Sequence, residues 1–594
     1  MVGHYTRLKV RRSLRFRQKQ VAGLSATANK QLDRHIFRRW HNFRSAGRFA
    51  IGWVSLVVIL IIAIVVQTKT LGSSYMVTTP VSGGVYTEGM IGSLSNINPI
   101  YATSDIDTSV SKLVFSSLFT YDGKNQIVGD LAQSWSVDSK GTTYTIKLKP
   151  NLYWSDGKPL TANDIVFTYN TIENPDAQSP LEYNFNDVTV TKIDSRTVQF
   201  ALPVAYSPFL YSLTNGIVPA HILSSIPIDQ LRSADFDTNS PIGSGPFVWK
   251  GISVNNISGG NQTETIQLAR NPSYYRGVAK LDGITIKTYP DENSLQSALD
   301  KNQVMTAAGM DLSDQVIAYK YNTYNFNLMS ANMLFLKTTS PLLSDVKVRQ
   351  ALVEATNVPI LLNQVGYTAI PVKEPILESQ VGYNSNYTQL AFNKTLAMNT
   401  LAADGWHVGG TGPYLMKNGQ QLMLNLVYNG SPEFSRIAAK LQSEWSSIGV
   451  NLQINVSQGS DFQRILDEHD YDVLLCGINI GSDPDVYAYW DSSQISATST
   501  YHLNFSEYKS SDTDLALETA RSRSDPAIRA AIYIQFLKAW QNDAPAIGLY
   551  QPRYLYVSSQ HIYGIDNPMI NVPSDRFDNV QNWMIKTAKM DDRT

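Results

Sequence analysis

Cysteine is nearly absent from this chain of 594 residues, which contains Cys476 and no other. A single cysteine forms no intramolecular disulfide, and this excludes the small secreted domains that disulfides hold together. Cys476 stands inside the apolar stretch DVLLCGI, where a free cysteine usually behaves as a small buried hydrophobic residue. We therefore do not expect a nucleophile at this position.

Signatures of several enzyme classes are missing as well. The sequence contains no G-x-S-x-G nucleophile elbow, no H-E-x-x-H zinc motif and no G-x-x-x-x-G-K-[ST] phosphate loop. The segment DEHDYD, residues 467–472, is a metal candidate, but it is typical of a solvated helix end followed by a strand. We expect no metal and no cofactor. The histidines after residue 48 form no ligand pair at helical or zinc-finger spacing: His221, His407, His469, His502 and His561.

Formal charge is absent from the eighteen residues between Phe49 and Val66. As a helix this run would be ~27 Å long, close to the hydrocarbon thickness of a bilayer. It predicts a membrane span. A cleaved signal peptide usually has a shorter apolar region and a short leader, whereas 48 residues precede this run. We expect an uncleaved anchor, with removal near the small residues 72–74 as the alternative.

The first 48 residues hold thirteen lysines and arginines and a single acid, whereas the rest of the chain has 36 basic and 49 acidic residues. The positive-inside rule keeps such a segment in the cytoplasm and sends everything after Lys69 across the membrane. We expect a single-pass protein of the cytoplasmic membrane with a large extracellular or periplasmic C-terminal part. A basic run beside a span is more often a topology signal or a lipid patch than a nucleic-acid site, so no nucleic acid is expected.

Two carboxylates in the stretch NLYWSDGKPLTANDIVFTYN, residues 151–170, invite a catalytic interpretation. Asp156 belongs to the turn sequence Ser-Asp-Gly-Lys, in which Asp bonds its own backbone and Gly takes a positive φ. Thr161 precedes an apolar helical pattern and Asp164 follows three residues later, which is a capping box. Both carboxylates thus have structural roles, and we do not expect a catalytic pair.

A βαβαβ pattern occupies residues 421–490. The stretches QLMLNLVYNG and VNLQINVS alternate as strands, SRIAAKLQSEWSSIG and DFQRILDEH have helical spacing, and YDVLLCGIN is a third, apolar strand. Crossovers of this kind build a parallel sheet, and ligands gather beyond the carboxyl ends of its strands. The pattern predicts a ligand end at Asn429 to Ser431 and Gly477 to Asp485.

The loop GSDPDVYAYW follows the third strand directly. One interpretation is a proline-fixed turn whose aromatic side chains pack into the core. Another is a cleft wall, in which aromatic rings supply contact area and carboxylates orient a cationic or hydroxyl-bearing ligand. A third is a D-x-D metal site for a nucleotide sugar, formed by Asp483 and Asp485.

Several motifs between residues 83 and 558 resemble, in order, those of extracellular solute-binding proteins of the peptide, dipeptide and nickel type, family 5, which serve ABC importers. The longest is GDLAQSWSVDSKGTTYTIKLKPNLYWSDGKPLTANDIVFTYN. It is followed by GSGPFVW, NPSYYRGVAKLDGITIK, SPLLSDVKVRQALVEATN and DYDVLLCGINIGSDPDVYAYW. The resemblance implies an α/β, two-lobed fold of the periplasmic-binding-protein kind (class II, cluster C), with a small inserted domain and a ligand enclosed when the lobes close.

The family's layout implies a division of the chain. Residues 1–48 form a basic cytoplasmic segment, 49–66 the transmembrane anchor and 67–82 a linker. The first lobe comprises residues 76–120, 206–332 and 552–594, the inserted domain residues 121–205, and the second lobe residues 333–551.

The resemblance departs from the family pattern at residues that would identify the ligand. Peptide-binding members commonly carry an acid shortly before the Asp-Pro pair, where it holds the ligand's terminal ammonium, but residues 479–482 are uncharged here. A tryptophan often found beside that strand is replaced by Ile478. The ammonium anchor is therefore expected at Asp483 or Asp485, unless the ligand is not a free peptide.

The resemblance implies a membrane-anchored receptor that captures an oligopeptide or a similar small solute and hands it to the permease subunits of an ABC transporter. We expect a monomer without catalytic activity, whose ligand pairs its backbone with the strand end at residues 477–479. Two alternatives stay open: a surface glycosyl transferase or hydrolase using Asp483 and Asp485, and a transport-inactive sensor that signals through the span. The candidate ligand-binding residues are Gly477, Ile478, Asn479, Asp483, Asp485, Tyr487, Tyr489 and Trp490.

Overall fold

The computed structural model describes most of the chain. It covers residues 47–74, 76–256, 262–310, 320–410, 412–499, 501–565 and 569–591. The basic segment predicted at residues 1–48 lies outside the described residues except for its last two. The chain separates into two compact units, one made of residues 1–79 with 587–594 and the other of residues 80–586.

The first unit contains the predicted span. Helix α3, Gly47–Ser74, includes the apolar segment Phe49–Thr70, which is long and apolar enough to cross a membrane and is not buried by any other part of the structure. The run predicted from the sequence lies inside this segment. Strand β1, Met76–Val81, pairs with β25, Lys586–Asp591, so the chain after the helix is joined to the C-terminal strand.

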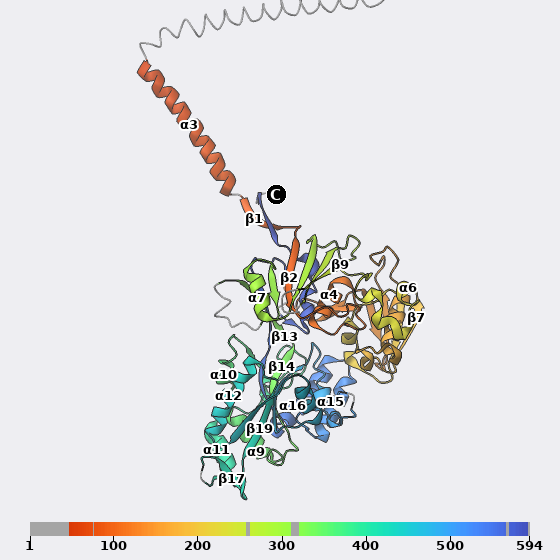
Figure 1. The fold of residues 1–594 in the computed structure, drawn as a ribbon, viewed down its shortest axis with the longest axis vertical. Coiled ribbons are helices and arrows are strands. Elements are labelled where there is room, and N and C mark those ends of the chain that lie inside the picture. The colour runs from red at the N-terminus through yellow and green to blue at the C-terminus, as the bar shows by residue number, and fades with distance from the viewer. Residues whose placement is uncertain are drawn as a thin grey trace, which may run out of the picture. The chain divides into compact units, whose positions relative to one another are not determined.

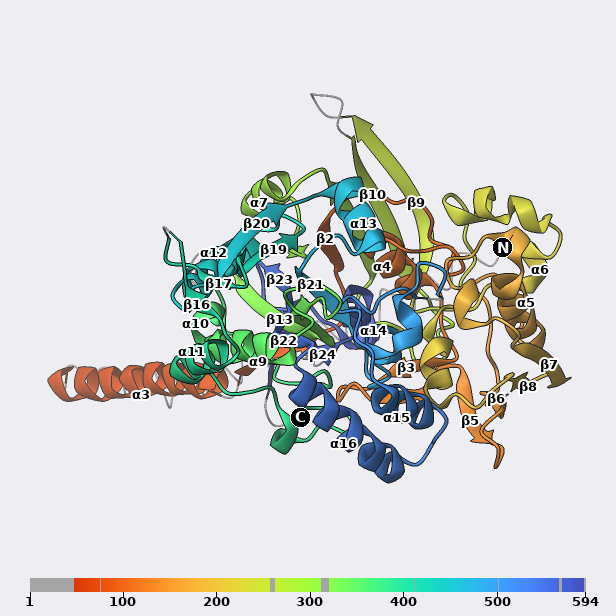
Figure 2. The ribbon, with the colours of Figure 1, turned by 90° about the horizontal axis from the view of Figure 1, so that it is seen from below.

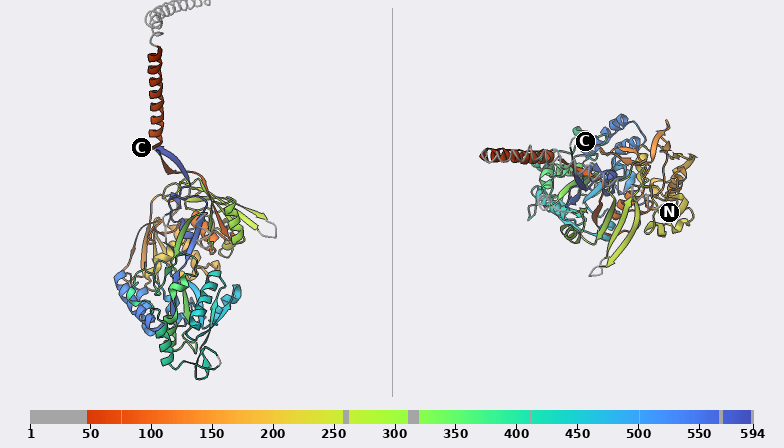
Figure 3. Two further views of the ribbon diagram at one scale, coloured as in Figure 1. Left: turned by 90° about the vertical axis from the view of Figure 1, so that its left-hand side faces the viewer. Right: turned by 90° about the horizontal axis from the view of Figure 1, so that it is seen from above.

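The first lobe is built on an eight-stranded sheet in the second unit (Figure 1). Its central strand β2 runs parallel to β11 and β12, while β9 and β10 form a long antiparallel hairpin that projects from the sheet (Figure 3). The strands in sheet order are β24 (Met569–Ile570), β13 (Asn322–Leu328), β23 (Arg553–Ser558), β12 (Thr306–Ala308), β2 (Val85–Ile91), β11 (Gly283–Tyr289), β10 (Gln262–Arg270) and β9 (Phe247–Asn256); its helices are α4 (Asp105–Val114) and α7 (Glu292–Asp300).

The inserted domain is a four-stranded antiparallel sheet with one long helix, and it lies apart from the other two large sheets (Figure 2). Its strands in order are β5 (Ala132–Val137), β6 (Thr143–Leu148), β8 (Thr197–Ala201) and β7 (Thr189–Asp194); α5 (Ala162–Glu173), α6 (Ala220–Leu223) and the hairpin β3 (Phe119–Tyr121) and β4 (Ile127–Gly129) adjoin it. The 3-10 segment η5, Ser207–Thr214, packs on this sheet. The ring of Phe209 in η5 contacts the ring of Phe200 in β8.

The capping box predicted at the start of α5 is confirmed. Thr161 caps the helix, and its backbone N–H donates to the Asp164 carboxylate over 2.8 Å. Asp156 accepts from the Lys158 N–H over 3.0 Å, as the predicted turn requires. Both carboxylates therefore have the local roles expected of them.

The second lobe has a six-stranded sheet with a separate hydrophobic core on each face. Along β14 the side chains alternate between these cores, with Leu334 and Leu336 in one and Met333 and Phe335 in the other. The strands in order are β15 (Ile370–Pro371), β22 (Ala546–Gln551), β14 (Ser330–Leu336), β21 (Val473–Asn479), β19 (Met423–Tyr428) and β20 (Asn451–Val456). The helices are α9 (Val346–Ala355), α10 (Val358–Leu362), α11 (Lys394–Ala403), α12 (Pro432–Ser446), α13 (Gly459–Glu468), α14 (Tyr487–Trp490), α15 (Ser511–Arg521) and α16 (Pro526–Asp543), with a small sheet of β16 (His407–Val408), β17 (Leu415–Lys417) and β18 (Gln420–Gln421).

The predicted βαβαβ run is confirmed, but the sheet that contains it is mixed. β19 runs parallel to β20 and to β21, which lie on its two sides, so the order in which successive strands are added across the sheet reverses at β19. β14 is antiparallel to both β21 and β22. The parallel arrangement predicted for the strands of the βαβαβ run is confirmed, and β14, which enters from the first lobe, adds an antiparallel neighbour to β21.

Two single-residue crossovers connect the lobes. β13 of the first lobe is followed by Met329 and then by β14 of the second lobe, and β22 is followed by Pro552 and then by β23. The crossovers lie side by side, since the Leu328 N–H donates to the Pro552 carbonyl over 3.0 Å. Short paired connections of this kind favour bending of one lobe against the other as a unit.

Candidate functional site: the carboxyl end of strand β21

The C-terminal half of β21 has an open edge. On one side the whole strand pairs with β14, but on the other side β19 reaches only Val473 and Leu474. Among the described residues, no strand continues the pairing beyond Leu474 on that side. A stretch of extended backbone at the end of the sheet nearest the crossovers is therefore available to an added strand.

The pairing with β14 determines which groups point to this edge. Ile480 donates its N–H to the Met329 carbonyl over 3.0 Å, and Asn479 faces Ser330. Because bonded and non-bonded pairs alternate in an antiparallel ladder, the odd-numbered residues of β21 direct their N–H and C=O groups away from β14. These include Gly477 and Asn479, which are both exposed. Ile478, with 3% of its surface exposed, packs into the core.

Asp483 is occupied by an ion pair. Its two oxygens accept hydrogen bonds of 2.6 and 2.7 Å from the two terminal nitrogens of Arg529 on α16. Both side chains are buried, and the Arg529 pKa is raised above its ordinary value by the carboxylate despite the opposing effect of burial. This fork geometry uses both oxygens of Asp483 for structure.

Asp485 is bonded through one oxygen. Its Oδ2 accepts from the Arg521 Nε and from the Tyr206 hydroxyl, both over 3.1 Å, and Oδ1 has no hydrogen bond to any described residue. Burial raises the pKa of this carboxyl, and Arg521 opposes that rise. The guanidinium lies 4.2 Å from the centre of the Tyr487 ring and 4.9 Å from that of Tyr206, within cation–π distance.

The three aromatic candidates occupy different environments. Trp490 has no exposed surface and packs against Phe335 in the core. Tyr489 is partly buried and donates its hydroxyl to the Asn479 carbonyl over 2.7 Å, and burial raises its pKa to about 12. Tyr487 carries the Arg521 guanidinium on its face. The predicted ligand contacts of these residues stay a prediction.

The loop after β21 also makes contacts with residues outside the second lobe. Tyr206 lies directly after the inserted domain in the chain, and its bond to Asp485 joins this segment to the second lobe. The Ser482 hydroxyl donates to the Asn571 side-chain oxygen over 2.7 Å, and the Asn571 amide bonds Asn125 over 3.0 Å. Sequence reasoning missed Tyr206, Arg521, Arg529 and Asn571, because each lies far along the chain from the loop it contacts and carries no motif.

A cavity of about 540 Å³ adjoins these contacts, between the inserted domain and the second lobe. Tyr183, Val188 and Phe209 line one side, and Tyr487, Tyr501 and Arg521 line the other. Ten of its sixteen lining residues are aromatic or aliphatic, and the other six, which include Asn184, Asn186 and Ser212, are polar or charged.

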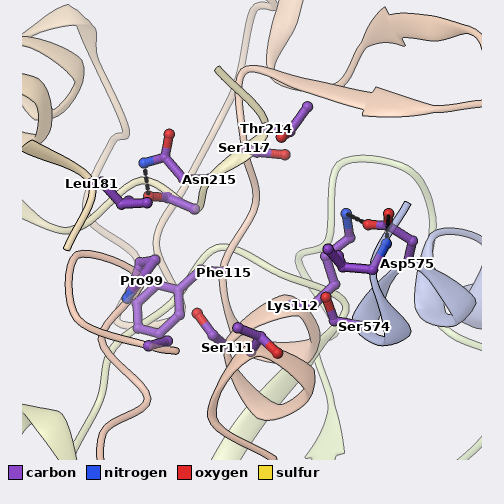
Figure 4. Close-up of a pocket in the computed structure, with 14 residues that line it drawn as sticks. Pro99, Ser111, Lys112, Phe115, Ser117, Leu181, Thr214, Asn215, Ser574 and Asp575 are labelled. Carbon is purple, nitrogen blue, oxygen red and sulfur yellow. Dashed lines mark hydrogen bonds and ion pairs between the residues drawn. The ribbon is translucent and has the colours of Figure 1, made fainter. Parts of the chain in front are cut away.

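A smaller cavity of about 200 Å³ lies within the first lobe, beside α4 (Figure 4). Lys112 lines it and binds Asp578 over 2.6 Å and Asp575 over 3.4 Å. Burial and the neighbouring Asp575 carboxylate raise the Asp578 pKa to about 6, against the effect of Lys112. The ammonium group is thus already neutralised by the protein.

The residues considered as metal ligands or as a nucleophile cap a helix, stack on one another or are buried in the core. Among the described residues, no group of three His, Cys, Asp or Glu side chains is placed to hold a metal ion. In the DEHDYD segment, His469 ends α13 and stacks on His502 with ring centres 4.5 Å apart. Cys476 is buried, and burial raises the pKa of its thiol.

Sequence comparison finds relatives among peptide-binding proteins of bacteria. The chain is 27% identical over 498 residues to the oligopeptide-binding protein AppA of Bacillus subtilis (strain 168), covering 82% of this chain and 89% of that protein. It is 25% identical over 488 residues to the dipeptide-binding protein of Escherichia coli (strain K12), covering 77% and 87%.

Solved structures agree with the sequence comparison. The structure of Bacillus subtilis AppA in complex with a nonapeptide has a TM-score of 0.67 and 26% identity, and the match covers 86% of this chain and all (100%) of that one. NikZ from Campylobacter jejuni in complex with Ni(L-His) has a TM-score of 0.69 and 25% identity, covering 84% and 99%. Residues 126–499 match the family described as bacterial extracellular solute-binding proteins, family 5 Middle. The chain therefore belongs to family 5 of the bacterial extracellular solute-binding proteins, the two-lobed binding proteins of ABC importers.

Proposed function

We propose that this protein is a membrane-anchored receptor that encloses an oligopeptide between its lobes and delivers it to the permease of an ABC transporter. The open edge of β21 is the observation that carries the proposal. An extended peptide added there would bond main chain to main chain, which gives affinity without demanding particular side chains. The similarity to AppA, which was solved with a nonapeptide, supports the same ligand class.

The ligand would lie along the exposed strand end. Gly477 offers its N–H and C=O, and Asn479 offers its N–H, while its C=O is held by Tyr489. Asp485, through Oδ1, is better suited than Asp483 to receive a terminal ammonium, because Arg529 occupies both oxygens of Asp483. Tyr487 and Tyr489 adjoin this end. Ile478 and Trp490 would act from the core, by supporting the strand and the loop.

Closure would capture the ligand. A ligand shifts the balance between open and closed lobes only by binding the closed state more tightly. The bonds from Tyr206 to Asp485 and from Ser482 to Asn571 would form in the closed state, beside the ligand.

The tether and the division into domains belong to the proposal. The apolar part of α3 would hold the chain in the cytoplasmic membrane, with the binding lobes outside and the protein a monomer. The proposed limits are 76–120, 206–332 and 552–594 for the first lobe, 121–205 for the inserted domain and 333–551 for the second lobe. The three large sheets support that division, except that β14 of the second-lobe sheet begins at Ser330, three residues before the proposed limit.

The test uses the full-length protein purified in detergent. Synthetic peptides of two to ten residues are added, and binding is followed by native mass spectrometry and small-angle scattering. We expect one peptide per chain and a smaller radius of gyration when peptide is present. Retention of a sugar or a metal chelate in place of every peptide would contradict the proposed ligand class. Hydrolysis of the peptides would contradict a binding role.

A further inference from the structure

The cavity between the inserted domain and the second lobe lies outside the strand edge along which we propose that the peptide binds. It measures about 540 Å³, and its walls come from two parts of the fold that closure brings together. Phe209 and Val188 form a buried apolar wall, and Tyr183 and Val204 stand exposed at its mouth. A filled cavity would therefore bind the two parts to each other.

The cavity adjoins the proposed ammonium site through two residues that bond Asp485. Tyr206 lines it and donates its hydroxyl to Asp485 over 3.1 Å. Arg521 lines it as well, and its Nε is bound to the same carboxylate oxygen. A peptide whose amino group reached Oδ1 of Asp485 would thus have its first side chains beside this cavity.

The charges around the cavity disfavour an anionic guest. The positive charge of Arg521 is balanced by Asp485, and Glu518, which is exposed, adds a negative charge to the lining. The guanidinium lies between the rings of Tyr487 and Tyr206, so its faces are also covered. Most of the remaining lining is aromatic and aliphatic surface, which large apolar groups occupy favourably, and Asn184, Asn186 and Ser212 add uncharged polar groups.

We propose that this cavity is a specificity pocket for a large apolar or aromatic side chain near the amino end of the bound peptide. The inference rests on the proposed function, and it adds that the inserted domain takes part in choosing the ligand. The size is adequate, since pockets for small organic groups begin at roughly 300 Å³.

Two serines provide a matched pair of variants. Ser522 lines the cavity at the end of α15, whereas Ser524 is exposed and outside the lining. Ser522→Trp should fill the cavity, and Ser524→Trp should add the same side chain to the surface. Val204→Asp, at a position with 68% exposure, should place a charge at the mouth without disturbing the core.

The experiment offers an equimolar mixture of pentapeptides X-Ala-Ala-Ala-Ala, with X as Ala, Leu, Phe, Lys or Asp, to the full-length protein. Bound peptides are quantified by mass spectrometry after removal of the free ones. We expect the wild type and Ser524→Trp to enrich the Phe peptide about tenfold over the Ala peptide. Ser522→Trp should reduce that ratio to below about twofold while still binding the Ala peptide, and Val204→Asp should favour Lys.

The outcomes separate the two proposals. Binding of the peptides without any preference at X, or a Phe preference that survives in Ser522→Trp, would overturn the specificity pocket and leave peptide capture intact. Failure of the wild type to retain any peptide would overturn the proposed function together with this inference. Retained binding of the Ala peptide by Ser522→Trp shows that this variant is folded.

Discussion

At the scale of single residues, Asp483 and Asp485 show how partners decide the role of two similar side chains. They are two positions apart in one loop, yet Asp483 is held on both oxygens by Arg529 and Asp485 on one by Arg521 and Tyr206. Removing one member of a buried ion pair leaves the other charge without compensation. A carboxylate with a free oxygen can instead accept from a ligand.

Changing each acid to Asn should therefore have different effects. Asp483→Asn should lower the free energy of unfolding by about 3 kcal/mol, because Arg529 stays buried without its counter-charge. Asp485→Asn should weaken binding of a peptide with a free amino end about tenfold, and binding of its N-acetylated form much less. Chemical unfolding and isothermal calorimetry measure the two quantities. Equal losses for free and acetylated peptides would show that Asp485 does not hold the ammonium group.

Glu374 is a second residue whose surroundings matter, because they change the pKa of its side chain. It is fully buried, accepts one hydrogen bond of 3.3 Å from the Asn384 N–H, and leaves its other oxygen without a partner among the described residues. Burial raises its pKa from 4.5 to about 8, and the Asn384 N–H opposes this rise. The folded protein thus holds a proton that the unfolded chain releases at lower pH.

This difference predicts a pH dependence with a definite sign. The folded state binds the extra proton between the two pKa values, so its stability should fall as the pH rises from about 4.5 to about 8 and then level off. Glu374→Gln lacks the titration. Its stability relative to the wild type should increase by about 2 to 5 kcal/mol between pH 5 and pH 9 in thermal unfolding. A constant difference across this range would contradict the assignment.

Among the strands, the pairing of β19 with only the first two residues of β21 leaves the rest of β21 open on one side. The remaining strand has one satisfied side and one open side. Exposed sheet edges attract other strands, and proteins usually cover them. An uncovered edge at the lobe crossovers is suited to the main-chain recognition of a peptide that we propose.

Main-chain pairing has a test on the ligand side that leaves the protein unchanged. A pentapeptide that binds is compared with versions carrying one N-methyl group at each successive amide. Because bonded groups alternate along an added strand, methylation should weaken binding about tenfold at alternate positions and little at the positions between them. Binding is measured by calorimetry. Uniform small effects at all positions would indicate recognition by side chains alone.

For the whole molecule, the lobe opening that we propose would depend on the two single-residue crossovers and on the bonds between the lobes. Met329 and Pro552 are the residues at which the chain changes sheets. The Tyr206 hydroxyl bonds Asp485 across the boundary between the inserted domain and the second lobe. Since this bond depends on the lobes being together, it should stabilise the closed state in addition to any ligand contact.

Tyr206→Phe should weaken closure while keeping the ring. Loss of one hydrogen bond, worth about 1 kcal/mol, should raise the dissociation constant of every peptide about fivefold, by a similar factor for each. Tyr153→Phe is the matched control, because Tyr153 is exposed and lies outside the cavity lining. Dissociation is measured by stopped-flow competition. A loss confined to particular peptides would indicate direct ligand contact by Tyr206 and would contradict a role in closure.

Features that depend on near neighbours in the chain could be predicted from the residues alone. The apolar run at Phe49 to Val66, the capping box at Thr161 and Asp164, and the parallel strands and helices of residues 421–490 follow from periodicity and local hydrogen bonding, and the structure has all three. Ordered motifs along the chain were enough to indicate the family.

Which of these features lie together in space depends on the packing of the whole fold. It placed Arg529 on Asp483 and Arg521 and Tyr206 on Asp485, and it made β14 antiparallel to its neighbours by bringing it in from the other lobe. It also formed the cavity, whose two walls are separated by almost three hundred residues of chain. Contacts between distant segments depend on how whole sheets and lobes pack, and no local pattern of residues records that packing.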